Sequence, residues 1–156
     1  MFRKMRRFKQ ALDKERCIDI LKTAPRGILA VNGDGGYPYT VPLDFVYDDN
    51  KLYFHSAVEG HKLDAIRRDG KASFCVLEQL EQSEDGWSYF FDSVVAFGTV
   101  GVVEDEAERM DKLRLLGLKY FPTADMVDSD IAENAHRALV LCLTVEHLSG
   151  KHVHER

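Results

Sequence analysis

The sequence predicts a mainly β fold with α-helices, in the form of a six-stranded antiparallel β-barrel with peripheral helices. Two observations carry this prediction. Strand-like segments follow one another through short turns, and they do not alternate with helices as βαβ units would. The chain of 156 residues is 45% hydrophobic and 30% charged, an ordinary globular balance for one domain over residues 1–156. Within it we expect a basic arm at 1–12 and a C-terminal tail at 147–156.

The predicted elements follow from apolar periodicity and from turn residues. In chain order they are a helix at 14–23, strands at 26–32, 37–47 and 51–56, a helix at 61–68, strands at 72–77 and 89–103, a helix from 106 to about 120, a helical piece at 131–136 and a strand at 138–145. Asp13 is a good N-cap for the first helix, and Pro25 ends it. Pro38 and Pro42 cannot donate ladder hydrogen bonds, so their strand must have an edge or a break.

Turn and cap residues also mark the second half of the chain. The polar stretch at 78–86 is expected to be a surface loop. Gly98 and Gly101 suit a β-bulge or a tight bend within a long strand. Asp105 and Glu108 form a D-x-x-E variant of the capping box, which predicts the start of the third helix. A barrel of this size fills its interior with side chains, so a large cofactor would sit outside it, as at a subunit interface.

Composition argues against several classes of protein. The net charge of −5 argues against nucleic-acid binding, although basic residues gather in the arm at Arg3, Lys4, Arg6, Arg7 and Lys9. No apolar stretch approaches the roughly 20 residues of a membrane span, and no apolar region behind the basic start resembles a secretory signal. Cys17, Cys75 and Cys142 are widely spaced, which predicts reduced, buried thiols in a cytoplasmic protein rather than a zinc site or a disulfide framework.

The most informative segment is the loop at residues 55–62, H-S-A-V-E-G-H-K. It follows a predicted strand and opens a predicted helix, so backbone N–H groups and the positive end of the helix dipole converge there. Ser56 adds a hydroxyl donor, Lys62 adds a positive charge, and Gly60 allows a close approach or a positive φ. The loop is therefore a candidate phosphate site, and a capped helix with a solvated lysine is the alternative. Its spacing is not that of a Walker A loop.

Several motifs resemble one family along nearly the whole chain, from residue 1 to about residue 151. They are M-F-R-x-M-R-R, R-G-I-L-A-V-N, Y-P-Y-T-V-P-L-D-F-V-Y, L-Y-F-H-S-A-x-x-G-H-K, S-V-V-A-F-G-x-V and L-x-x-L-x-x-K-Y-F-P. The sequence is similar to the pyridoxamine 5′-phosphate oxidase-like, FMN-binding split-barrel superfamily, and within it to the nitroimidazole-resistance (Nim) proteins. The resemblance implies a split β-barrel, an FMN cofactor and a homodimer with two flavin sites between its subunits.

The resemblance also implies which residues form the site. In this family the loop after the third strand binds the flavin phosphate, which points to His55, Ser56, Ala57, Gly60, His61 and Lys62. The second strand lies along the isoalloxazine ring, and a later long strand completes the pocket, which points to Val41, Pro42, Leu43, Asp44, Ser93 and Val94. Judged from the residues alone, Val41, Leu43 and Val94 are equally suited to a core, and Asp44 to a surface turn.

These expectations lead to a flavin-dependent oxidoreductase that reduces a small aromatic or nitro compound such as a nitroimidazole. His61 is the candidate proton donor, because histidine titrates near neutral pH; a hydrogen bond to phosphate or backbone is the alternative. A non-catalytic flavin-binding protein remains open. So does a haem-binding split barrel with an axial ligand among His55, His61, His147, His152 and His154. Residues 148–156 lack the Arg-Leu-rich motif of true pyridoxamine phosphate oxidases, so vitamin B6 oxidation is not expected.

Overall fold

The computed structural model describes residues 1–154, without the side chains of residues 79 and 80. One antiparallel sheet has the strand order β2-β1-β5-β6-β7-β4-β3. Its strands are β1 (Gly27–Asn32), β2 (Pro38–Leu43), β3 (Val46–Asp48), β4 (Lys51–Ser56), β5 (Lys71–Gln82), β6 (Tyr89–Val102) and β7 (Leu139–Val153). The α-helices are α1 (Lys14–Thr23), α2 (His61–Arg68), α3 (Glu106–Tyr120) and α4 (Ala124–Asn134). Short 3₁₀ helices lie at η1 (Phe8–Gln10), η2 (Asp34–Gly36) and η3 (Ala135–Arg137).

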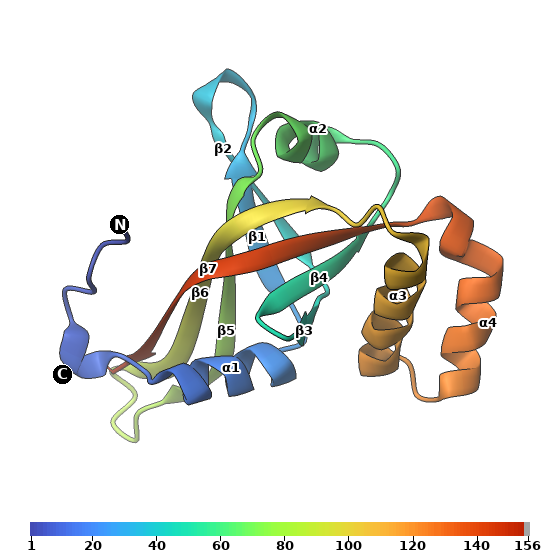
Figure 1. Cartoon of the computed structure of the whole chain (residues 1–156). Helices are drawn as coiled ribbons and strands as arrows, with labels where there is room; N and C mark the ends of the chain where they lie inside the picture. The colour runs from blue at the N-terminus through green and yellow to red at the C-terminus, as the bar shows by residue number, and fades with distance from the viewer. Residues whose placement is uncertain (155–156) are drawn as a thin grey trace.

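The sheet curls into a half-barrel because its two edge strands, β2 and β3, are consecutive along the chain (Figure 1). Only Asp44 and Phe45 separate them, so the opposite edges of the sheet must approach each other. This confirms the mainly β fold class and is consistent with a split barrel. The predicted strand at 37–47 is broken at this point, which makes seven strands instead of six. Pro38 and Pro42 lie in the edge strand β2, so both the predicted edge and the predicted break are present.

Two strands are longer than the sequence predicts. β5 continues through residues 78–82 of the expected surface loop, where it pairs with β6 beyond a register shift. β7 continues through residues 147–153, which the sequence predicts as a C-terminal tail, and these residues also pair with β6. Both extensions are largely polar and lack a clear apolar alternation. Their pairing with β6, rather than a local pattern, makes them strands.

The helices begin at capping residues. Asp13 and Asp105 accept hydrogen bonds from amides of the first turn and start α1 and α3 as predicted. α4 begins at Ala124, so the helical piece predicted at 131–136 covers only its end and η3. The side chain of Thr123 caps α4 by accepting a hydrogen bond from a first-turn amide. Figure 1 shows α3 and α4 side by side at one end of the sheet.

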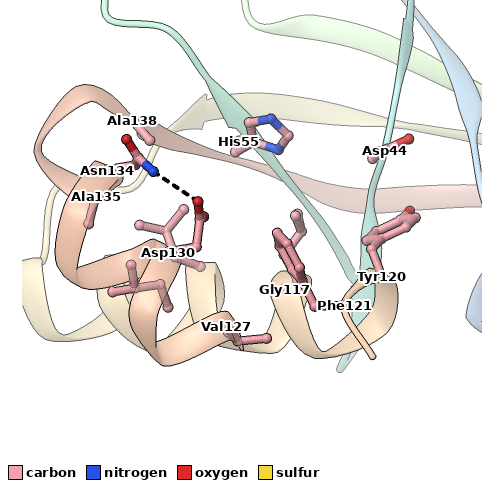
Figure 2. Close-up of a pocket in the computed structure, with 13 residues that line it drawn as sticks. Asp44, His55, Gly117, Tyr120, Phe121, Val127, Asp130, Asn134, Ala135 and Ala138 are labelled. Carbon is pink, nitrogen blue, oxygen red and sulfur yellow. Dashed lines mark hydrogen bonds between the residues drawn. The ribbon is translucent and has the colours of Figure 1, made fainter. Parts of the chain in front are cut away.

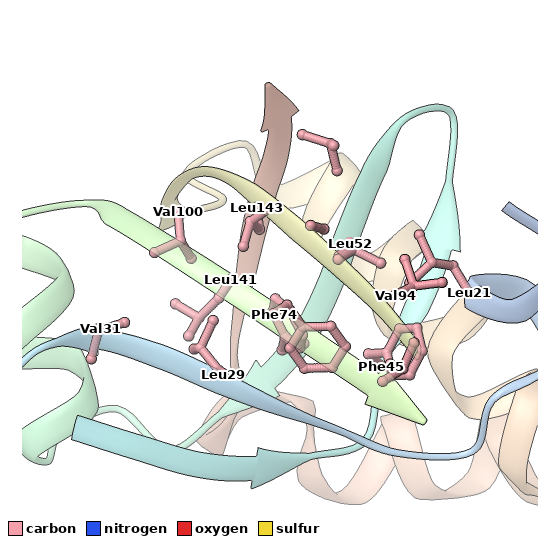
Figure 3. Close-up of a cluster of buried hydrophobic side chains, with 14 of the residues drawn as sticks. Leu21, Leu29, Val31, Phe45, Leu52, Phe74, Val94, Val100, Leu141 and Leu143 are labelled. Atoms are coloured by element: carbon pink, nitrogen blue, oxygen red, sulfur yellow. The ribbon is translucent and has the colours of Figure 1, made fainter. Parts of the chain in front are cut away.

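The core fills the inside of the curled sheet and extends to α1 and α2 (Figure 3). Phe74 lies within it, with its ring centroid 4.8 Å from that of Phe45 and 5.0 Å from that of Phe54. Leu21 of α1 and Leu63 of α2 are completely buried in the same cluster. Each such side chain contributes about 1.5–3 kcal/mol on burial, so both helices are firmly attached to the sheet.

No helix within residues 1–154 is long and apolar enough to cross a membrane. The three cysteines are free; Cys17 is buried, and Cys75 and Cys142 are half-buried. No group of His, Cys, Asp and Glu side chains in the described part of the chain is arranged to hold a metal ion.

Candidate functional site

A pocket of about 330 Å³ opens where the end of β2, the end of β4 and the start of α2 meet. Its lining brings together predicted site residues from two separate segments: Pro42, Leu43, Asp44, His55, Ser56, Ala57 and Lys62. Arg26, which directly precedes β1, also lines the pocket and is absent from the predicted set. The predicted phosphate loop and the strand expected beside a flavin ring therefore share one pocket.

The curled sheet brings these segments together. β2 is one edge of the sheet and β4 lies next to the other edge, so their ends meet only because the sheet closes on itself. Leu63 and Ile66 anchor α2 in the core and so fix the position of Lys62. Gly60, the N-cap residue, has a φ of +130°, which favours glycine, and it supplies no side-chain cap. The first-turn N–H groups of α2 are therefore available to an anion.

Lys62 dominates the electrostatics of this pocket. Its side chain is half-buried, and burial lowers the pKa of its ammonium group. Among the residues that the structure describes, the ammonium group of Lys62 makes no hydrogen bond or ion pair. Ser56, only 5% exposed, supplies a hydroxyl to the same lining. Because a buried cation without a partner costs free energy, an anion in this pocket would be stabilised by Lys62.

Arg26 and Asp44 form an ion pair at the pocket, with 2.7 Å between Nε and Oδ1. The hydrogen bond to Asp44 raises the pKa of the Arg26 guanidinium. The register of β1 with β2 pairs Gly27 with Leu43, so the next residues outward, Arg26 and Asp44, face each other. That register follows from the tight turn at 33–36. Counting residues outward from this turn on both strands pairs Arg26 with Asp44, so Arg26 could have been identified from the sequence.

Five predicted site residues do not line this pocket: Val41, Gly60, His61, Ser93 and Val94. Val41 packs against the core, and Val94 is completely buried within it. Ser93 precedes Val94 in β6, and neighbouring side chains of a strand point to opposite faces. Ser93 therefore faces the outer side of the sheet, and Val94 faces the inside of the half-barrel.

Two histidines are held by contacts away from the pocket. His61, the predicted proton donor, lies with its ring centroid 4.1 Å from that of Tyr39 and its Nε2 3.5 Å from Asp34 Oδ2. His61 is not among the pocket-lining residues. His152 Nδ1 lies 2.7 Å from Asp92 Oδ1, on the extended part of β7. The catalytic role of His61 thus stays a prediction that this arrangement does not support.

A second cavity, of about 410 Å³, adjoins the first (Figure 2). The two cavities share Asp44 and His55, and the opposite wall of the second is formed by α3 and α4. His55 is exposed, and its side chain has no hydrogen-bond or ion-pair partner within residues 1–154. A molecule in the first pocket would therefore lie next to the second cavity, beside these two side chains.

Comparisons with known proteins agree with this fold. The sequence matches the family described as pyridoxamine 5′-phosphate oxidase over residues 13–152. The fold is similar to that of a protein assigned to 5-nitroimidazole antibiotic resistance in Bacteroides thetaiotaomicron, with a TM-score of 0.76 and 23% identity over 91% of this chain and 86% of that chain. A comparison with curated proteins returned no match.

Two further solved structures with this fold are named for flavin binding. One is an FAD-binding protein from Mesorhizobium loti, with a TM-score of 0.65 and 22% identity over 92% of this chain and 97% of that chain. The other is an FAD and heme binding protein from Mycobacterium smegmatis, with a TM-score of 0.72 and 24% identity over 91% and 72% of the two chains. The match over most of the sequence confirms the resemblance seen in its motifs, and the chain belongs to the pyridoxamine 5′-phosphate oxidase family.

Proposed function

We propose that the pocket around Lys62 binds the phosphate of FMN and that the protein is a flavin-dependent reductase of small aromatic or nitro compounds. The observation that carries the proposal is the half-buried ammonium group of Lys62, which has no partner in the described part of the chain. A phosphate dianion supplies the missing partner, and charge-assisted hydrogen bonds of this kind are the strongest in proteins.

The remaining pocket residues fit both the phosphate and the ring of the cofactor. Ser56 and the first-turn N–H groups of α2 supply further donors to the phosphate. Pro42 and Leu43 offer an apolar strand surface for the flavin ring. When bound, the flavin would supply the transfer of hydride or single electrons, while the chain positions it and sets its surroundings. Family membership and the flavin-binding proteins of the same fold support a flavin over other phosphates.

The fold shared with the nitroimidazole-resistance protein supports a nitro compound as the acceptor. A nitroimidazole is therefore the first acceptor to test.

The visible absorption spectrum of the purified protein tests the cofactor. We expect flavin bands and the release of FMN on denaturation. A colourless protein that fails to take up added FMN would overturn the proposal. A Soret band without flavin bands would support the haem alternative.

Steady-state oxidation of a reduced nicotinamide cofactor, with a 5-nitroimidazole as acceptor, tests the reductase activity. We expect turnover that depends on bound flavin. No turnover with any donor, despite stoichiometric flavin, would contradict the reductase proposal and leave a non-catalytic flavin-binding protein.

The proposal includes a homodimer with the flavin sites at its interface, and the outer face of the sheet supports it. Strand register aligns mostly small and apolar side chains in rows on this face: Ile28, Cys75, Val95 and Ser149 in one row, and Ala30, Ser73, Phe97 and His147 in the next, where Phe2 of the same chain stacks on His147. Ile28 and Leu77 are 43% and 57% exposed there. A sheet face of this composition is typical of a surface that a partner covers.

A matched pair of substitutions tests the dimer. Ile28→Glu places a charge on the outer sheet face, whereas Leu118→Glu changes an equally exposed residue of α3, 42% against 43%. We expect Ile28→Glu to sediment as a monomer and to lose flavin, and Leu118→Glu to keep both dimer and flavin. A parent protein that sediments as a monomer would contradict this arrangement.

A further inference from the structure

The cavity between the helices and the sheet, which we call the helical cavity, is built mainly from apolar side chains. They come from α3, from the turn after it and from α4: Leu113, Leu116, Tyr120, Phe121, Val127 and Ile131. The helices approach closely because α3 has Gly117 at the contact, where a Cβ would lie 2.7 Å from Val127. The volume of about 410 Å³ lies within the range of small-molecule sites.

The walls of the helical cavity are held in place by partly buried hydrogen bonds. Arg109 Nη1 donates to the backbone carbonyls of Ala135 and Ala138, at 2.8 Å each, and so fixes the end of α4 and η3. The hydroxyl of Tyr120 accepts from the amide of Phe45 at 2.9 Å, which fixes the opposite wall. The cavity is therefore formed before any ligand arrives, and binding requires little ordering of the chain.

The charges of the helical cavity are opposite to those of the phosphate pocket. Its lining contains the carboxylates Asp44 and Asp130, and no lysine or arginine among the described residues. Asp130 lies at an exposed position and accepts a hydrogen bond from Asn134 at 2.9 Å. An anion would be repelled here, whereas an uncharged or cationic molecule would not.

We propose that the helical cavity is a second binding site, for a neutral or cationic aromatic molecule of two or three rings. It is separate from the Lys62 pocket and meets it at His55 and Asp44. Its occupant would therefore lie beside the cofactor and is suited to be the acceptor. The role of the occupant as acceptor rests on the proposed function, whereas its binding in the helical cavity does not.

Two fluorescent probes that differ by one sulfonate test the site. N-phenyl-1-naphthylamine is uncharged, and 8-anilino-1-naphthalenesulfonate has the same rings with a negative charge. Each is titrated into the purified full-length chain, as isolated and after addition of FMN. We expect the uncharged probe to saturate at one site per chain and to bind at least about fivefold more tightly than the sulfonate, a difference of about 1 kcal/mol.

A matched pair of substitutions locates the probe. Ala138→Leu fills the helical cavity without removing the carbonyl that Arg109 contacts, and Ala132→Leu adds the same volume at an exposed, non-lining position of α4. We expect Ala138→Leu to weaken the uncharged probe at least about tenfold, and Ala132→Leu to leave it within about twofold. Equal binding by the parent and Ala138→Leu would overturn the assignment.

Asp130→Asn tests the charge of the cavity without altering its volume. We expect sulfonate binding to strengthen about threefold and binding of the uncharged probe to change by less than about twofold, because only the anion is repelled by Asp130. If the parent binds both probes equally, or neither, the inference is wrong. Failure to bind FMN while the uncharged probe still binds would remove the proposed function and leave this site intact.

Discussion

Two half-buried lysines differ in what their ammonium groups contact. Lys119, near the end of α3, donates hydrogen bonds to the carbonyls of Ala24 at 2.7 Å and Phe45 at 2.8 Å, and it lies 3.9 Å from the centroid of the Phe45 ring. Lys62, at the start of α2, has no such partner within residues 1–154. Burial lowers the pKa of both groups, that of Lys119 to about 8.

The comparison separates a structural lysine from the one proposed to bind a ligand. Lys119 ties the break between β2 and β3 to the segment between α1 and β1, so its contacts stabilise the closure of the sheet. The ammonium group of Lys62 is partly removed from water, and no contact offsets this unfavourable desolvation. A bound ligand of opposite charge would offset it. Burial together with the lack of a partner, rather than burial alone, is therefore the observation that supports Lys62 as the proposed binding residue.

The largest expected effect is on stability. Lys119→Met should lower the free energy of unfolding by about 2–3 kcal/mol, because the carbonyl of Ala24 loses its donor and that of Phe45 keeps only the Tyr120 hydroxyl. Lys62→Met should change it by less than about 0.5 kcal/mol or increase it, because a desolvated charge disappears. Urea denaturation of both variants measures the difference. Equal losses in the two variants would contradict the comparison.

A second effect concerns pH. The lowered pKa of Lys119, about 8, means that the unfolded chain binds a proton between that pH and roughly 10.4, where the folded chain does not. The contribution of Lys119 to stability therefore rises with pH across this window. Lys119→Met should flatten the rise, measured by urea denaturation from about pH 8 to about pH 10. The same slope in both proteins would show that Lys119 does not titrate there.

The smallest expected effect is that of Arg26. Its side chain is 62% exposed and already paired with Asp44, so Arg26→Met should weaken FMN only about threefold. This loss should disappear at high salt, because exposed charges are screened. Fluorescence titration with FMN at low and high salt measures both values. A loss of tenfold or more would make Arg26 rather than Lys62 the main phosphate ligand.

Much of the fold follows from local signals in the sequence. Asp13 and Asp105 predict the starts of α1 and α3, and the prolines of β2 predict its edge position and the break after it. The extensions of β5 and β7 could not be predicted, because each depends on a distant strand rather than on its own pattern. The start of α4 was predictable from Thr123, a standard N-cap residue after Pro122.

Part of the candidate site also follows from local sequence signals, and part depends on tertiary contacts. Lys62 and Ser56 follow from a loop between a strand and a helix, and the structure brings them into one pocket with Asp44. The inward orientation of Val94 depends on the register of β6, which no local pattern reveals. The helical cavity requires the packing of α3 against α4 and the sheet. Such packing is set by tertiary contacts and has no sequence motif.

The role of Lys62 is tested most directly by titrating FMN and riboflavin, which differ only in the phosphate. The proteins compared are the parent, Lys62→Met and the control Lys22→Met, which changes an exposed lysine of α1. We predict that the parent prefers FMN by at least about tenfold, that Lys62→Met loses this preference through weaker FMN binding, and that Lys22→Met keeps it. Equal affinity of the parent for both flavins, or an unchanged preference in Lys62→Met, would contradict the proposed phosphate site.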